Sequence, residues 1–191
     1  VKRWQLKLNI TLFLSKEGSA ICRRHELGKI NQQIWASDFM SRWGYFVDIL
    51  YRTINSIIKV FSVKTGSGDI IFSSSDFWPD SFPALILKRR NPKIIWIAGF
   101  YLFAPKPWQK DSPYRGKNFL TGLLYWIGQL PTYYIIRRFA DIVFVTSQPD
   151  VDQFTTNIRS KERVIVIRGG VDTVSAKHYL NSKNVIPPEK R

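Results

Sequence analysis

Hydroxyl and carboxylate side chains follow an apolar run near the middle of the chain. The stretch DIIFSSSD, residues 69–76, passes from two isoleucines and a phenylalanine into three serines and an aspartate. Serine hydroxyls both donate and accept hydrogen bonds, whereas a carboxylate accepts them, so Ser74, Ser75 and Asp76 suit a hydroxyl-rich, sugar-like ligand. The alternative, which the sequence leaves open, is that Asp76 or a neighbouring serine caps the following helix.

The next apolar run also ends in residues that favour a binding site. In the stretch IAGFYLF, Gly99 lets the backbone approach another group closely, and Tyr101 offers an amphipathic platform. An equally open interpretation is an aromatic side chain packed beneath a loop. The candidate acceptor-binding residues are therefore Ser74, Ser75, Asp76, Gly99 and Tyr101.

Two later runs end in a serine and in paired glycines. Ser147 stands three residues before Asp150, which is a capping-box-like start for a helix. In VIVIRGGVD the glycines serve either a turn with positive φ or the close approach of a ligand. The candidate residues of a cleft here are Ser147, Arg168, Gly169, Gly170 and Asp172.

Short apolar runs and helical periodicity alternate along the chain and must position these residues. Strands are expected at residues 8–14, 69–73, 93–98, 141–146 and 163–167, with a weaker one at 31–35. Helices are expected over 44–61, where apolar residues recur every three or four positions, over 84–90, and over 118–139, where Pro131 should kink or split the helix. Residues 15–29 are expected to form a polar loop.

This alternation predicts an α/β fold, a three-layer Rossmann-like domain whose largely parallel sheet is covered on both faces by helices. Ligands of such sheets bind at the carboxyl ends of the strands, which is where the candidate residues fall. The domain is expected to span residues 1–172, and the polar residues 173–191 to form a linker.

Composition narrows the class of ligand but does not choose it. The 191 residues include 29 lysines and arginines against 14 acidic residues, so the net charge is +15, which attracts nucleic acid, nucleotides or anionic lipid. Cys22 is the sole cysteine, which excludes an internal disulfide, and no zinc spacing surrounds His25 or His178. The sequence lacks the dinucleotide-binding motif, the Walker motif and the nucleophile-elbow motif. We expect no metal and no cofactor.

Three stretches together, residues 69–90, 137–154 and 163–172, resemble the amino-terminal domain of GT-B fold glycosyltransferases of family 4. The family usually has Pro-Asn-Gly-Val-Asp where this chain has RGGVD, and it often has a histidine near the position of Gly99. The family's first strand with its glycine-rich loop and its carboxyl-terminal donor domain have no counterpart in this sequence. The paired glycines would correspond to the turn between the two domains of the family.

The resemblance implies the acceptor-side domain of a retaining, metal-independent glycosyltransferase. Such an enzyme moves a sugar from a nucleotide-diphosphate sugar to a glycan, lipid or small-molecule acceptor. The donor would be held mainly by the absent domain, so this chain alone is expected to be inactive, and no catalytic residue is assigned. A cytoplasmic protein, at the cytoplasmic face of a membrane, is expected.

Two other interpretations stay open. A basic chain with seven tryptophans suits a module that binds nucleic acid, although most of the aromatic residues lie in apolar runs typical of a core, so no nucleic-acid partner is expected. Alternatively, the helix after Gly44 and the apolar segment 119–136 are expected to contact an anionic membrane surface.

Overall fold

The computed structural model describes residues 7–25, 27 and 30–167, and strands alternate with helices through most of this range. The strands are β1 (Thr11–Ser15), β2 (Asn31–Ala36), β3 (Ile70–Ser73), β4 (Ile95–Gly99), β5 (Ile142–Val145) and β6 (Val164–Val166). The α-helices are α1 (Lys16–Arg24), α2 (Tyr45–Val60), α3 (Trp78–Arg90), α4 (Phe119–Phe139) and α5 (Asp150–Phe154). Each expected strand is therefore present, and none of its bounds differs from the expectation by more than about three residues.

The strands form two parallel sheets, which confirms the α/β, Rossmann-like class. The main sheet has the order β3-β4-β5-β6, and β1 pairs with β2 in a smaller sheet. The sequence predicts one sheet that includes residues 8–14, so this placement of β1 is a correction. Its physical reason is the short crossover through α1, which closes a local parallel β-α-β unit between β1 and β2.

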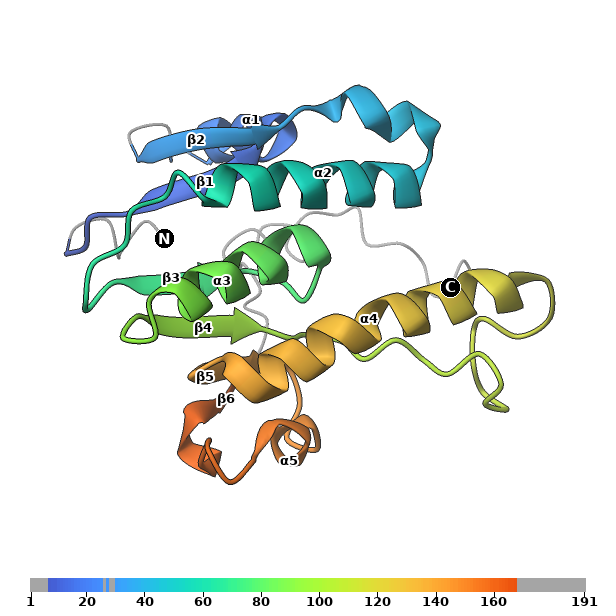
Figure 1. The fold of residues 1–191 in the computed structure, drawn as a ribbon. Coiled ribbons are helices and arrows are strands. Elements are labelled where there is room, and N and C mark those ends of the chain that lie inside the picture. The colour runs from blue at the N-terminus through green and yellow to red at the C-terminus, as the bar shows by residue number, and fades with distance from the viewer. Residues whose placement is uncertain (1–6, 26, 28–29, 168–191) are drawn as a thin grey trace, which may run out of the picture.

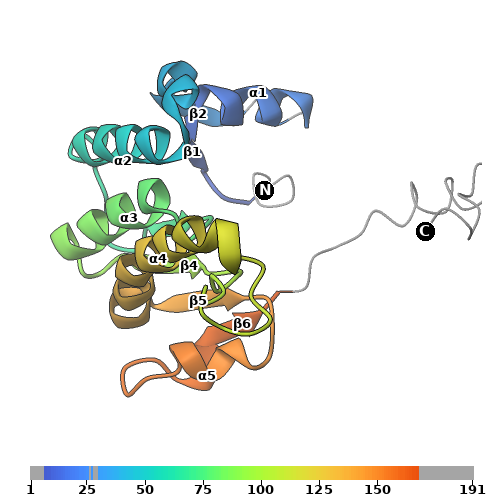
Figure 2. The same cartoon turned by 90° about the vertical axis from the view of Figure 1, so that its right-hand side faces the viewer.

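The elements stack in three layers. Helices α2, α3 and α4 run along one side of the sheets, and α1 covers the opposite side of β1 and β2 (Figures 1 and 2). Alternate strand residues such as Trp96, Val143 and Val145 are buried beneath α3, α4 and α5. On the other face of the main sheet, Ile70, Phe72, Ile95 and Ile165 are exposed. Among the described residues, helices thus cover the main sheet on one face, not on both.

Two expectations about local structure are wrong in part: the loop at residues 15–29 and the split of the helix at Pro131. Residues 16–24 form α1 and not a loop, because the Ser15 side chain accepts a hydrogen bond from the Gly18 N–H and caps the helix. Helix α4 runs through Pro131 without a break. Pro131 and Ile127 are both on the exposed side, where water can solvate the carbonyl that the proline leaves unpaired. No helix in the described ranges is long and apolar enough to cross a membrane.

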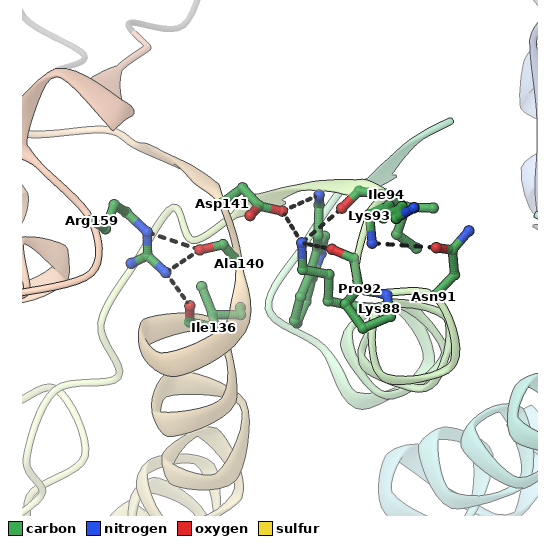
Figure 3. Close-up of polar contacts among 10 residues, drawn as sticks. Lys88, Asn91, Pro92, Lys93, Ile94, Ile136, Ala140, Asp141 and Arg159 are labelled. Carbon is green, nitrogen blue, oxygen red and sulfur yellow. Dashed lines mark hydrogen bonds and ion pairs between the residues drawn. The ribbon is translucent and has the colours of Figure 1, made fainter. Parts of the chain in front are cut away.

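A buried arginine ties the carboxyl end of α4 to the loop after α5 (Figure 3). The Arg159 guanidinium is almost completely buried and donates to the carbonyls of Ile136, at 2.8 Å, and of Ala140 and Phe154. Carbonyls at the end of a helix carry partial negative charge, and most of them have no backbone partner, although that of Ile136 also accepts from the Ala140 N–H at 3.2 Å. The cation therefore satisfies them, although burial lowers the pKa of Arg159 to about 10.

Asp141 joins α3, β4 and β5 beside this arginine. Its Oδ2 accepts hydrogen bonds from Lys88 Nζ and from the Trp96 backbone N–H, both at 2.7 Å (Figure 3). Lys88 also donates to the carbonyls of Pro92 and Ile94. These contacts fix the amino-terminal edge of the main sheet at β4 and β5.

Candidate functional site

The residues predicted at the ends of β3, β4 and β5 come together at one edge of the main sheet. Ser74, Ser75 and Asp76 follow β3, Gly99 ends β4, and Ser147 lies two residues beyond β5. These three strands are neighbours and parallel, so their carboxyl ends meet at the same edge. The remaining cleft residues, Arg168, Gly169, Gly170 and Asp172, lie outside the described residues.

The two serines hold the start of α3. Ser74 Oγ and Ser75 Oγ donate to Asp80 Oδ2 at 3.0 and 2.6 Å, and Ser75 Oγ accepts from the Phe77 N–H at 3.3 Å. The hydroxyls are therefore engaged with the first turn of the helix. Of the two interpretations of the serines, these contacts favour the structural one, with Asp80 as their partner.

Asp76 lies in a different network, which is centred on Gln129 of α4. Gln129 Nε2 donates to Asp76 Oδ2 and to the Leu102 carbonyl, each at 2.7 Å, and its Oε1 accepts from the Ala104 N–H at 2.7 Å. One amide thus orients the carboxylate and fixes the loop after β4. Both Nε2 protons and the Oε1 of Gln129 are used in these contacts, so the pair offers a ligand the remaining acceptor capacity of the Asp76 carboxylate, which suits a hydroxyl group that donates.

Tyrosines from three segments form a wall beside Asp76. The Tyr45 ring lies 5.4 Å from that of Tyr125, which lies 6.0 Å from that of Tyr114. Tyr45 is 42% exposed, and desolvation of its covered part, then Tyr125, and then the negative charge of Asp76 raise its pKa to about 12. Aromatic surfaces beside a few convergent polar groups are typical of small-molecule sites.

Burial raises the pKa of both carboxyls near this edge. Desolvation is the main cause for Asp76, with the charge of Asp80 adding to it, while the hydrogen bond from Gln129 opposes it. For Asp80, desolvation outweighs the hydrogen bonds from the two serines. Both folded-state pKa values therefore lie above those of the unfolded chain.

This shift predicts how stability depends on pH. A carboxyl whose pKa is higher in the folded state binds its proton more tightly there, so the free energy of unfolding falls as pH rises from about 4 through the folded pKa. Asp80→Asn keeps an oxygen for the serine hydroxyls and removes the charge, so it should flatten that fall and leave stability at neutral pH equal or higher. Urea unfolding between acid and neutral pH measures this, and a variant as pH-dependent as the wild type would contradict the assignment.

Gly99 and Tyr101 contact each other. A Cβ on Gly99 would lie 2.6 Å from the Tyr101 hydroxyl oxygen, and Thr146 Oγ1 donates to the Tyr101 carbonyl at 2.5 Å. The close approach that Gly99 permits is therefore to this tyrosine, as in the alternative of an aromatic packed beneath a loop. Burial also raises the pKa of Tyr101.

Ser147 lies at the start of α5, as its spacing to Asp150 indicates. Its Oγ donates to Asp150 Oδ2 at 2.5 Å. The hydroxyl is thus engaged with the first residue of the helix, which is a structural use at the same edge of the sheet.

Several residues of the site were not predicted from sequence: Gln129, Asp80, Tyr45, Tyr114 and Tyr125. Gln129 gave one usable signal, because it is a lone polar residue within the apolar stretch LLYWIGQL. It also lines an open groove of about 490 Å³ between α4 and the loop after β4, together with Lys106, Trp126 and Tyr133.

The fold defines the class of protein, a parallel α/β, Rossmann-like domain, and polar and aromatic side chains gather at the carboxyl ends of its strands. In the part of the chain that the structure describes, no group of histidine, cysteine or acidic side chains is arranged to hold a metal ion. No protein-family model matches the chain, and no curated protein matches it either.

Proposed function

We propose that this chain is the acceptor-side domain of a retaining, metal-independent glycosyltransferase that uses a nucleotide-diphosphate sugar. The observation that supports it most is Asp76, held by Gln129 and flanked by the tyrosine wall, at the carboxyl edge of a parallel sheet. The sequence resemblance over residues 69–90, 137–154 and 163–172 points to the same activity.

The residues have separate tasks in this proposal. Asp76 accepts a hydrogen bond from an acceptor hydroxyl, and Gln129 fixes the orientation of the carboxylate. Tyr45 and Tyr125 present aromatic surface to the apolar face of a sugar ring or of a similar group. Positioning an acceptor hydroxyl accelerates transfer because the reacting atoms are held in near-attack geometry, while charge on the leaving diphosphate is stabilised from the donor side.

Asp76→Asn should weaken the binding of a simple glycoside. The substitution preserves the side-chain shape and an oxygen for Gln129, but it removes the charge that strengthens a hydrogen bond from a hydroxyl. A hydrogen bond to a charged group contributes about 1.5–3 kcal/mol, so affinity should fall by roughly tenfold or more. Saturation-transfer NMR with a panel of methyl glycosides measures this.

Asp152→Asn is the matched control, because it makes the same change on α5, in a side chain that is mostly exposed and away from the site. It should bind glycosides as the wild type does. Equal binding by the wild type and Asp76→Asn, or no binding of any glycoside by the wild type, would contradict the proposal.

A further inference from the structure

Two of the three buried residues of α2 are small and polar, whereas several large apolar residues of this helix are exposed. Thr53, Ser56 and Val60 are buried, whereas the opposite side of the helix is an exposed stripe of Val47, Leu50, Ile54, Ile58 and Phe61. Helices on the surface of a soluble domain normally show the reverse arrangement. The apolar stripe therefore requires its own explanation.

The buried side of α2 explains how this inversion is tolerated. Thr53 Oγ1 donates to the Ile49 carbonyl at 2.7 Å and Ser56 Oγ to the Thr53 carbonyl at 2.8 Å, so neither hydroxyl lacks a partner. The charged residues of α2 are also engaged away from the stripe. Arg52 bridges Asp48, at 2.7 Å, and Glu17 of α1, at 3.1 Å, and Lys59 Nζ donates to the Ile34 carbonyl of β2 at 2.9 Å.

Helix α4, in the same layer, also exposes a stripe of large apolar residues. Gly122, Thr132 and Ile136 are buried, and the opposite side of the helix carries an exposed stripe of Leu120, Leu124, Ile127 and Tyr134. Helix α3 lies between α2 and α4, and the three helices form one side of the molecule (Figure 2). We call these two apolar stripes, on α2 and α4, the outward face.

The border of the outward face is aromatic and basic. Trp43 and Tyr45 are exposed at the amino-terminal end of α2. At its other end, the Arg90 guanidinium lies 5.9 Å from the centre of the Phe61 ring. Exposed Lys117 precedes α4 and exposed Arg138 is in its last turn. Amphipathic aromatic residues and cations of this kind favour the polar headgroup region of a membrane.

We propose that the outward face binds to an anionic membrane surface, with both stripes in contact with the acyl boundary. An extended exposed apolar surface indicates an interaction site. Two separate stripes with α3 between them suit a continuous lipid surface better than a single partner helix. The net charge of +15 and the basic border add electrostatic attraction to anionic headgroups.

The outward face meets the candidate site at Tyr45 and Tyr125, which belong to α2 and α4 and contact each other. If the outward face lies on a membrane, the acceptor is a lipid-borne molecule that reaches the site from the membrane surface. This statement about the acceptor rests on the proposed function. Membrane binding itself does not depend on the reaction.

The test is co-sedimentation of the whole chain with vesicles of equimolar phosphatidylcholine and phosphatidylglycerol. The wild type should bind, and raising the salt concentration should weaken binding because the Debye length shrinks. The double variant Leu50→Gln, Ile54→Gln changes side chains that are 52% and 49% exposed, so the fold should be retained. It should lower the vesicle affinity by more than about tenfold, through the lost apolar transfer energy.

Ile158→Gln is the matched control, because Ile158 is 71% exposed in the loop after α5, away from the outward face. It should bind vesicles as the wild type does. Wild-type affinity in the double variant, or equal wild-type binding to pure phosphatidylcholine, would overturn the proposal. A further contradicting result would be that the wild type does not bind vesicles but self-associates without lipid, as measured by light scattering, and that the double variant abolishes this self-association. The outward face would then bind a second copy of the chain.

The glycoside titration separates the two proposals. If the outward face binds membranes but no glycoside binds near Asp76, the proposed function fails and the membrane surface stands. If glycosides bind and vesicles do not, the membrane inference fails and the proposed function stands.

Discussion

Arg159→Met should lower the free energy of unfolding by about 3 kcal/mol, because buried carbonyls would lose a charged donor and no water could replace it. Arg159 donates to the ends of both α4 and α5, through Ile136, Ala140 and Phe154. Methionine fills a similar volume without donating. For a chain of this size, such a loss lowers Tm by roughly 6–12 °C.

Arg163→Met is the control, since it removes the same group from an exposed side chain just before β6. Its Tm should change little, because exposed substitutions usually alter stability by about 0.5 kcal/mol or less. Thermal unfolding followed by circular dichroism compares the two variants. Equal melting temperatures would show that the buried guanidinium does not stabilise the fold.

Gln129→Leu should cause the largest loss at the candidate site. Leucine preserves the bulk of the side chain but leaves Asp76, the Leu102 carbonyl and the Ala104 N–H without the amide that joins them. Each unsatisfied group costs about 1–3 kcal/mol when it stays buried, so part of this cost will be relieved by movement of the loop after β4. Glycoside affinity should therefore fall more than in Asp76→Asn.

Gln148→Leu, which makes the same change at an exposed position before α5, is the matched control. Chemical denaturation and glycoside titration of both variants separate loss of stability from loss of binding. A Gln129→Leu protein that is folded and binds glycosides normally would show that this amide does not organise a site.

Most strands could be predicted because each is a short run of apolar residues that ends in polar or glycine residues, as at Ser73 and Gly99, whereas β2 begins with three polar residues and gave a weaker signal. Helix α1 could not, since most of its residues are polar or small, as in a loop, and its start depends on one hydrogen bond from Gly18 to Ser15. The separation of β1 and β2 from the main sheet was likewise invisible, because periodicity identifies strands but not their partners.

The candidate site was located in part, because the topology of a parallel sheet places strand ends at one edge. The roles of individual residues were not accessible, since they depend on partners far along the chain. Gln129 and Asp76 are 53 residues apart, and Arg159, in a mostly polar turn, gives no sequence signal that it is buried at the carboxyl end of α4. For the serines next to Asp76 both a ligand role and a structural role were open, and their contact with Asp80 is visible only in the folded chain.

Mapping bound glycosides on the ¹⁵N-labelled chain would decide whether the carboxyl edge of the main sheet binds a sugar acceptor. We predict saturable shifts in the amides of Asp76, Phe77 and Ala104 with at least one methyl glycoside, and weaker effects with UDP- or GDP-sugars. An absence of shifts at these amides with every glycoside, or tight binding of a nucleotide-sugar there, would contradict the proposed function.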